Sequence, residues 1–491
     1  MCRPEMPQPD GATTVDPTKA ALTPRVISQA EMLDAGSGSN KKRLFTRAEV
    51  EEKGSGPDAE YYFIIKKQVY KVPQKWAMTG HPGGEILLRD ARGTDITLQF
   101  LGNHRDEFVA PLLKRFQVGY VEDEQSPMET EFATMIEDLQ SDPDWFQCSY
   151  LFYAGVQLRY FAILFASVAC VVYGESFSVR CILAAVLMGF YFQQVAFIGH
   201  DTGHNGVTHS LFADECLGLF WGNAMSGISG GWWKATHNVH HLVTNSVEYD
   251  PDIQHLPVYA VTEKYFKGVF SEYHMRVLPF DRISQIVVRF QHLLYYPILA
   301  VARVNLYLQS FLLCLSPYPV FRRWGGKSRT KELACLGFFW AWFSLLVAQL
   351  PTAGERIAFV MLAHAVSGIL HVQITISHFP MPVIEGNPLK NKEINWIQVQ
   401  LSGSMDVECP TWMDWFHGGL QFQAVHHLIP RIPRHNLRRL RDEKILPFCK
   451  KHGLEYKRAG FIACNLMVID TLRKTADKVS PFLWDAINAQ G

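Results

Sequence analysis

Four long apolar stretches constrain the fold of this chain more than any other feature of its sequence. Each approaches the length of about 20 residues that an α-helix needs to cross a bilayer. They cover approximately residues 151–173, 181–199, 333–351 and 356–378. A fifth stretch, 293–315, contains Pro297, Arg303 and Gln309 and is better suited to an interfacial or partly buried helix. The sequence therefore predicts an all-α integral membrane domain with about four transmembrane helices.

The rest of the chain differs in composition from these stretches. Residues 61–65 and 69–72 favour β-strands, and the polar residues 66–68 between them would turn a hairpin. Residues 1–43 are rich in Pro, Gly, Ser and Thr, and residues 123–145 are acidic and polar. We therefore predict a disordered leader, a small α+β domain, a linker or surface helix, a membrane domain and a C-terminal cytosolic tail, over residues 1–43, 44–122, 123–145, 146–450 and 451–491.

Charge and cysteine content argue against several classes of protein. The 47 basic and 47 acidic residues give a formal net charge of +0, which offers no whole-chain argument for a nucleic-acid partner. None of the 10 cysteines forms a C-x-x-C pair, so neither a zinc knuckle nor a dithiol redox motif is indicated. We expect the cysteines to be reduced, and the first residues lack the apolar segment of a secretory signal.

A first candidate site is the motif His81-Pro82-Gly83-Gly84 with a second histidine, His104, further along the chain. Two neutral imidazoles bound to a haem iron from opposite sides leave the metal no open position, so such a site passes single electrons and does not bind oxygen. The paired glycines allow the backbone to approach the flat macrocycle. By itself the short motif leaves open a Pro-Gly turn with an incidental histidine.

Three short histidine-rich segments, each beside an apolar stretch, form a second candidate site. Their spacings are H-x-x-x-H, H-x-x-H-H and, with glutamine in the first place, the second spacing again. On a helix these spacings place the side chains on one face. Imidazole suits zinc, copper, iron and nickel alike, but a ligand set of this size implies two ions. The candidate ligands are His200, His204, His237, His240, His241, Gln423, His426 and His427.

The order of the predicted spans supports a single site. Two spans precede the first two histidine segments and two more precede the third, so an even number of crossings separates the small domain from each segment. All of them then face one side of the membrane, provided that residues 293–315 do not cross it. The haem site and the metal site are thus predicted in one compartment, as electron delivery between them requires.

These motifs resemble those of known families. The small domain resembles cytochrome b5 through His81-Pro82-Gly83-Gly84 and, around it, Val69-Tyr70-Lys71-Val72, Gly93-Thr94-Asp95, Phe100 and Val118-Gly119-Tyr120. With the three histidine segments and Gln423, the chain closely resembles the cytochrome b5-fusion front-end desaturases of the membrane fatty-acid desaturase superfamily. The resemblance covers nearly all of residues 44–450.

The resemblance implies an O2-dependent diiron lipid desaturase bound to a membrane. His81 and His104 would bind haem b, and the histidine segments would hold two irons that activate O2 and remove two hydrogens from adjacent methylenes. The superfamily uses a further ligand near the position of His378, which joins the candidate set. Electrons would come from NADH through a flavin enzyme, cytochrome b5 reductase, and the fused haem. The family and these partners imply the endoplasmic reticulum membrane, with the haem domain and a histidine-rich cap facing the cytosol.

Two segments favour one class of lipid substrate. Residues 237–257 and 414–427 look more like Δ8 sphingolipid long-chain-base desaturases than like acyl Δ5 or Δ6 enzymes. Acyl front-end enzymes more often carry Gln-Ile-Glu-His-His in the third segment, where this chain has Ala424 and Val425. The alternatives are an acyl front-end (Δ5/Δ6/Δ8) desaturase, a diiron lipid hydroxylase, against which Gln423 argues, and a non-enzymatic membrane metal transporter or electron-transfer adaptor.

Several polar residues outside the motifs are secondary candidates. His364, His371 and His378 recur every seven residues on nearly one helical face, and we expect His371 to line the substrate cavity or to pack in the core. The basic segment 431–441 would suit lipid headgroups or a solvated interfacial face. The carboxylates suited either to orienting imidazoles or to capping are Asp201, Asp250 and Asp252. No specific role is predicted for His209, His255, His417 and His435.

Overall fold

The N-terminal part of the fold is built on a four-stranded sheet with strand order β1-β4-β3-β2. Strands β2 (Tyr61–Ile65) and β3 (Gln68–Val72) pair antiparallel, which confirms the predicted hairpin. Lys66 and Lys67 turn the chain with positive φ angles of 50° and 65°, as tight two-residue hairpins require. The other two strands, which pair in parallel, are β1 (Arg43–Phe45) and β4 (Gln117–Val121).

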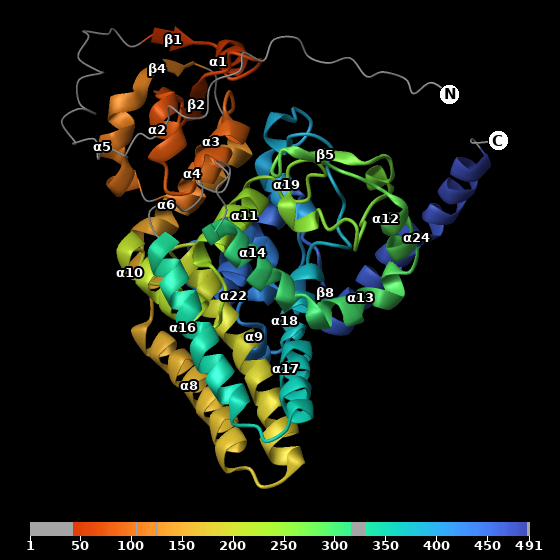
Figure 1. Ribbon diagram of the computed structural model, residues 1–491. Coiled ribbons are helices and arrows are strands. Elements are labelled where there is room, and N and C mark those ends of the chain that lie inside the picture. The colour runs from red at the N-terminus through yellow and green to blue at the C-terminus, as the bar shows by residue number, and fades with distance from the viewer. Residues whose placement is uncertain (1–42, 105, 123–125, 316–328, 489–491) are drawn as a thin grey trace, which may run out of the picture. The chain divides into compact units, whose positions relative to one another are not determined.

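The structure is a computed structural model that describes residues 43–104, 106–122, 126–315 and 329–488 (Figure 1). Apart from residue 43, the predicted leader lies outside the described residues. Gly84 begins a helix with a φ of 91°, a conformation that glycine adopts without strain. The helices that complete the α+β part are α1 (Arg47–Lys53), α2 (Gln74–Thr79), α3 (Glu85–Ala91), α4 (Thr97–Asn103) and α5 (Asp106–Phe116).

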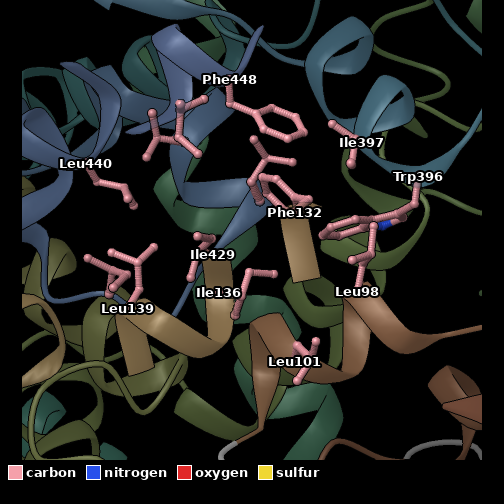
Figure 2. Close-up of a cluster of buried hydrophobic side chains, with 14 of the residues drawn as sticks. Leu98, Leu101, Phe132, Ile136, Leu139, Trp396, Ile397, Ile429, Leu440 and Phe448 are labelled. Carbon is pink, nitrogen blue, oxygen red and sulfur yellow. The ribbon is translucent and has the colours of Figure 1, made fainter. Parts of the chain in front are cut away.

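Helix α6 (Pro127–Ser141), followed by the short α7 (Pro143–Phe146), occupies the segment that the sequence predicts as a linker or surface helix. Phe132, Ile136 and Leu139 of α6 are buried, because their helical spacing forms one apolar stripe. The segment is therefore a core element rather than an exposed linker. In Figure 2 this stripe shares one cluster with residues of α4 and of the C-terminal half of the chain, among them Leu98, Leu101, Ile429, Leu440 and Phe448.

Among the residues that the structure describes, four helical segments are long and apolar enough to cross a membrane, and they coincide with the predicted spans. They extend over Pro143–Tyr173, Ser178–Gly203, Arg329–Ala348 and Ala353–Thr375. Their elements are α8 (Tyr150–Tyr173), η2 (Ser178–Leu183), α9 (Ala184–Gly203), α16 (Arg329–Ala348), α17 (Ala353–Ser367) and α18 (Ile369–Thr375). Helix α9 packs against both α8 and α17 (Figure 1). Leu158 of α8 and Leu345 of α16 are 71% and 67% exposed, as side chains facing lipid would be.

The fifth apolar stretch forms two helices, α13 (Gln291–Val301) and α14 (Arg303–Leu315), bent by 60° at the break between them. Arg303 is fully buried at this break and donates hydrogen bonds to the backbone oxygen and the hydroxyl of Ser226 at 2.6 and 2.8 Å. A sharp bend at a buried polar anchor agrees with the prediction that this stretch is a poor span.

The histidine-rich part of the fold, here called the cap, consists of short elements outside the spans. Its longer helices are α10 (Leu211–Gly218), α11 (Gly230–Leu242), α12 (Arg282–Arg289), α19 (Trp396–Gly403) and α23 (Leu446–His452). Its shorter ones are η3 (Leu219–Ala224), η4 (Pro251–Ile253), η5 (Glu263–Lys267), η6 (Pro388–Lys390), η7 (Thr411–Met413), α20 (Asp414–His417), η8 (Leu420–Phe422), α21 (Gln423–Leu428), η9 (Arg434–Asn436), α22 (Leu437–Leu440) and η10 (Arg441–Ile445). The strand pairs are β5 (Val269–Ser271) with β6 (Arg276–Leu278), and β7 (Asp406–Glu408) with β8 (Arg458–Gly460).

Helix α24 (Phe461–Asn488) occupies most of the predicted C-terminal tail. Cys464, Val468 and Leu472 are buried in one apolar cluster with Tyr295 of α13. The tail is therefore packed onto α13, and its apolar spacing of four residues explains why.

Candidate metal centre

The first histidine segment stands at the end of α9. His200 lies in the last turn of this helix and His204 is its C-terminal capping residue, with ring centroids 4.9 Å apart. The Nε2 atom of each ring is buried and has no hydrogen-bond partner among the described residues. Buried ring nitrogens without a protein partner are available as metal ligands.

The second segment lies on α11, and a buried carboxylate fixes the start of this helix. Ser229 is the N-cap, and its hydroxyl donates to Glu332 of α16. Glu332 also accepts from the side-chain amide of Asn223 at 3.2 Å. The membrane span α16 is thereby tied to the helix that carries the second segment. The residues that α11 contributes are His237, His240 and His241.

The third segment lies on α21, which Asp406 of β7 anchors. The backbone N–H of Ala424 donates to Asp406 Oδ1 at 3.0 Å, and the Tyr456 hydroxyl donates to Oδ2 at 2.5 Å. Burial raises the pKa of Asp406 to about 7, although both donors lower it. These bonds fix the direction in which α21 presents His426 and His427.

The structure gathers the three segments into two groups of histidines. The first group is His200, His204, His237 and His426, and the second is His240, His378 and His427. Within each group, one ring nitrogen per residue lies within 4.8 Å of the others. A metal ion bound at about 2 Å by each imidazole fits this spacing. His241 lies between the groups, with its ring centroid 4.5 Å from that of His204 and 4.1 Å from that of His427.

Two further predicted ligands are His378, which lies outside the three segments, and Gln423, which takes the first place of the third segment. The ring centroid of His378 lies 4.6 Å from that of His240, and its Nδ1 lies 3.1 Å from the Gly403 carbonyl oxygen, which leaves Nε2 free for the centre. The Oε1 atom of Gln423 is buried, and no residue in the described ranges hydrogen-bonds to it. Gln423 thus offers an acceptor to a metal or to a water beside it.

Two of the three candidate carboxylates orient imidazoles. Asp250 Oδ2 lies 2.8 Å from His240 Nδ1, and Asp252 Oδ2 lies 3.4 Å from His237 Nδ1. Bonds of this kind fix the tautomer in which Nε2 points to a metal. Burial lowers the pKa of His237 to about 4, so this ring is neutral, as metal binding requires. Burial also acts on His240, but the two carboxylates outweigh it and raise its pKa.

Asp201 has a different role, because it joins elements. It accepts from the Tyr153 hydroxyl at 2.8 Å and pairs with Arg434 Nε at 3.2 Å, whereas His200 Nδ1 is 3.6 Å away. Arg434 also donates to the Tyr160 hydroxyl at 3.3 Å. Helix α9, which carries the first histidine segment, is thereby tied to α8 and to the loop after the third segment. Arg434 is buried, so the basic segment 431–441 is not a solvated face at this position.

We expect Asp250→Asn to lower the metal affinity of the second histidine group by about 10- to 100-fold. Asp250 Oδ2 meets His240 Nδ1 and also accepts from the backbone N–H of Asn245 at 2.7 Å, and Oδ1 accepts from the backbone N–H of Asp252 at 2.8 Å. The NH2 group of an asparagine would therefore face a donor in either orientation. The measurement is metal content per chain during titration with a chelator. Glu385→Gln, at an exposed cap residue, is the control. Unchanged affinity would remove Asp250 from this role.

A second site lies in the N-terminal part, where His81 and His104 face each other with ring centroids 6.0 Å apart. Their Nδ1 atoms lie 3.1 Å from the carbonyl oxygens of Gly84 and Phe100 respectively. Both Nε2 atoms are therefore left for a shared metal, and the ring spacing suits an iron held at about 2 Å by each ring. Burial lowers the pKa of His104 to about 3, so the ring is neutral, as haem ligation requires.

The two sites approach each other through α4. A Cβ at Gly102, two residues before His104, would lie 3.1 Å from the carbonyl oxygen of Leu428. Leu428 directly follows His427. Gln140 of α6 donates to the His104 carbonyl oxygen at 3.1 Å and holds this end of α4 in place. A few backbone bonds and one close contact thus separate the candidate haem ligand from the third histidine segment.

The remaining histidines lie outside both groups. His364 Nδ1 bonds the Val360 carbonyl oxygen at 2.7 Å. His371 is buried, and neither ring nitrogen has a partner among the residues that the structure describes. Its position fits the expected core or cavity role. His209 bonds the carbonyl oxygens of Asn205 and Phe146 at 2.8 and 2.6 Å, which is a structural role.

Sequence analysis missed several residues that act on the ligands from a distance along the chain. The amide oxygen of Gln400 lies 3.0 Å from His427 Nδ1, on the side away from the centre. No spacing rule connects such a residue to the histidine it holds, since the two meet only through tertiary packing. The others in this class are Glu332, Asp406 and Arg434.

Comparisons with known proteins agree with this geometry. Residues 177–460 match the family model described as fatty acid desaturase, and residues 46–122 match the cytochrome b5-like haem/steroid binding domain. The chain is 38% identical to the Delta(8)-fatty-acid desaturase of Helianthus annuus, over 92% of this chain and 97% of that protein. It is 37% identical to the acyl-lipid (9-3)-desaturase of Borago officinalis, over 92% and 99% respectively. The Delta 8-(E)-sphingolipid desaturase of Kluyveromyces lactis is 42% identical over 69% of this chain and 58% of that protein.

Proposed function

Because the chain belongs to the fatty acid desaturase family and carries a cytochrome b5-like domain, we propose that it inserts the Δ8 double bond into the long-chain base of a sphingolipid. The observation that carries the reaction type is the two histidine groups, which bring residues at the ends of two apolar helices together with residues of α11 and α21. The substrate rests on the segments around the second and third histidine groups and on relatives named Δ8 sphingolipid desaturases.

The histidines would divide between two irons. His200, His204, His237 and His426 would hold one, and His240, His378 and His427 the other, with His241 between them and Gln423 beside the first turn of α21. When bound, the irons supply the activation of O2 for removal of two hydrogens. The residues around them orient the rings: Asp250, Asp252 and Gln400 hold outer nitrogens, and burial keeps most of the rings neutral.

Electrons would enter through the N-terminal site. Conversion of CH2–CH2 and O2 to CH=CH and two waters consumes two electrons and two protons from outside. His81 and His104 would hold a haem, which supplies transfer of single electrons when bound. NADH would supply them through cytochrome b5 reductase, with the haem domain and the cap on the cytosolic side of the endoplasmic reticulum membrane. The contact between α4 and Leu428 supports direct delivery within the chain.

A second candidate is an acyl front-end desaturase, since two of the similar proteins are named for fatty-acid or acyl-lipid substrates. The site chemistry would be the same, and the difference lies in what holds the polar end of the lipid. A diiron hydroxylase is disfavoured by Gln423 in the third segment.

We expect expression of this chain in a host that lacks such enzymes to yield a long-chain base unsaturated at carbon 8. Fatty acids and long-chain bases are separated before mass spectrometry locates the double bond. His427→Ala, expressed at equal level, is the inactive control. New double bonds in acyl chains alone would overturn the substrate, and a new hydroxyl group would overturn the reaction type.

A further inference from the structure

A buried polar network lies between two membrane spans and the loop that precedes the third histidine segment. Gln193 Nε2 of α9 donates to Gln373 Oε1 of α18 and to the Phe416 carbonyl oxygen, both at 2.8 Å. Gln194 Nε2 donates to Gln193 Oε1 at 2.8 Å and to the Trp415 carbonyl oxygen at 3.1 Å. Such polar contacts inside an apolar helix bundle are costly to bury and mark functional sites by default.

The hydrogen bonds among the side-chain amides of Gln193, Gln194 and Gln373 set the orientation of Gln373. Gln373 in turn fixes the tautomer of His417. Gln373 Nε2 donates to the Phe416 carbonyl oxygen at 3.1 Å and to His417 Nδ1 at 3.3 Å. Since Nδ1 accepts, the proton of the neutral ring lies on Nε2. Burial lowers the pKa of His417 to about 4, so the ring is neutral near pH 7. His417 therefore presents an N–H donor at Nε2.

The network ends in one unused donor and one unused acceptor. His417 Nε2 and Gln194 Oε1 are buried and have no hydrogen-bond partner in the described part of the chain. The two residues are 1% and 0% exposed, so bulk water does not reach them. All other polar atoms of these amides are paired. A buried polar atom without a partner is destabilising, and a ligand group that pairs with it is bound selectively.

These open atoms lie close to the candidate metal ligands. Gln194 precedes His200 by six residues of α9, a distance of about 9 Å along the helix. On the other side, Gly418 follows His417 and lines a small cavity with His200 and His426. A group held by the network would thus lie a few methylenes from the metal ligands along a lipid chain.

We propose that His417 and Gln194 form a subsite for a lipid group that both donates and accepts a hydrogen bond, a hydroxyl or a secondary amide. His417 Nε2–H pairs with the oxygen of that group, and Gln194 Oε1 accepts its hydrogen. An ester or thioester has only acceptors and leaves Gln194 unpaired. The subsite therefore selects lipids of the sphingoid class over acyl esters. This inference rests on the proposed function and names what the same site recognises.

The test compares purified His417→Phe and wild-type enzyme on matched lipids. The lipids are a ceramide, its analogue without the hydroxyl on carbon 3, and its N-methylated analogue, which lacks the amide hydrogen. We expect the variant to raise KM for the ceramide by about tenfold or more, with little change for the analogue that lacks the recognised group. If wild-type enzyme binds the analogue without the hydroxyl weakly, the recognised group is the hydroxyl. If it binds the N-methylated analogue weakly, the recognised group is the amide.

Two further variants separate recognition from folding. His417→Gln keeps a donor at this position and should restore most of the preference for ceramide. Trp412→Phe changes an exposed ring on the same loop and should leave all three KM values unchanged. Iron content per chain reports on the fold in each case. Equal loss on all three lipids at normal iron content would overturn the subsite, as would an unchanged KM for ceramide. Activity of wild-type enzyme on acyl lipids alone would instead overturn the proposed function.

Discussion

Replacement of His378 by alanine is expected to remove one of the two irons and to lower turnover by at least about 100-fold. His378 follows the last span, and its ring lies 4.6 and 4.9 Å from those of His240 and His427. Its Nδ1 is engaged by the Gly403 carbonyl oxygen, so the ring is directed rather than free to turn. With His378 removed, the second group retains only two of its three histidines.

His371→Ala provides the matched control, because His371 stands seven residues earlier and is also buried, but lies in neither histidine group. The measurement is iron per chain by elemental analysis, together with oxygen consumption and product. The control should retain two irons per chain. Full iron content in the His378 variant, or equal iron loss in both variants, would contradict the assignment of His378 as a ligand.

Replacement of His81 by alanine is expected to abolish the haem absorbance and to lower NADH-dependent turnover by at least about tenfold, while iron content is unchanged. With His81 removed, only His104 would remain to hold the haem, so we expect the group to be lost and with it the supply of single electrons. The two metal sites use separate residues, so loss of one cofactor leaves the other bound.

Thr79→Ala, at an exposed residue just before the same turn, is the control for this variant. Absorbance of the reduced protein reports on haem, elemental analysis on iron, and product formation on turnover. Turnover at the wild-type rate without haem would show that the fused domain is not the required donor. Loss of iron together with haem would show that the variant has misfolded.

Much of the candidate metal centre could be predicted from the sequence, because the spacing of histidines along a helix determines which of them lie on the same face. Two histidines four residues apart at the end of an apolar stretch lie on one face whatever surrounds them, and His200 and His204 show this. The same argument placed His378 in line with His364 and His371. Helical spacing alone could not decide which of these three histidines contacts the other histidine segments, because the contact depends on how α17 and α18 pack against the cap.

Other features were beyond sequence reasoning for a physical reason. Asp201 directly follows His200 in the sequence, whereas Asp250 lies nine residues after His241. Of these two carboxylates only Asp250 orients a ring, because Arg434 and Tyr153 pair with Asp201. Helix α6 carries a buried apolar stripe, whereas the acidic and polar composition of residues 123–145 led to the prediction of a linker or surface helix. Which apolar surface covers a stripe is decided by residues hundreds of positions away, such as Phe448.

The apolar cluster that α6 shares with α4 and the cap limits where N-terminal domains can be exchanged between related proteins. An exchange of N-terminal domains between relatives cut at residue 122 would transplant Leu98 and Leu101 but leave the recipient's Phe132 and Ile136 opposite them. The donor α4 would then meet a foreign helix. A cut after residue 146 moves both partners together and confines the new junction to the surfaces around Ile429 and Phe448. In this architecture the unit of recombination therefore extends two helices, α6 and α7, beyond the unit that binds haem.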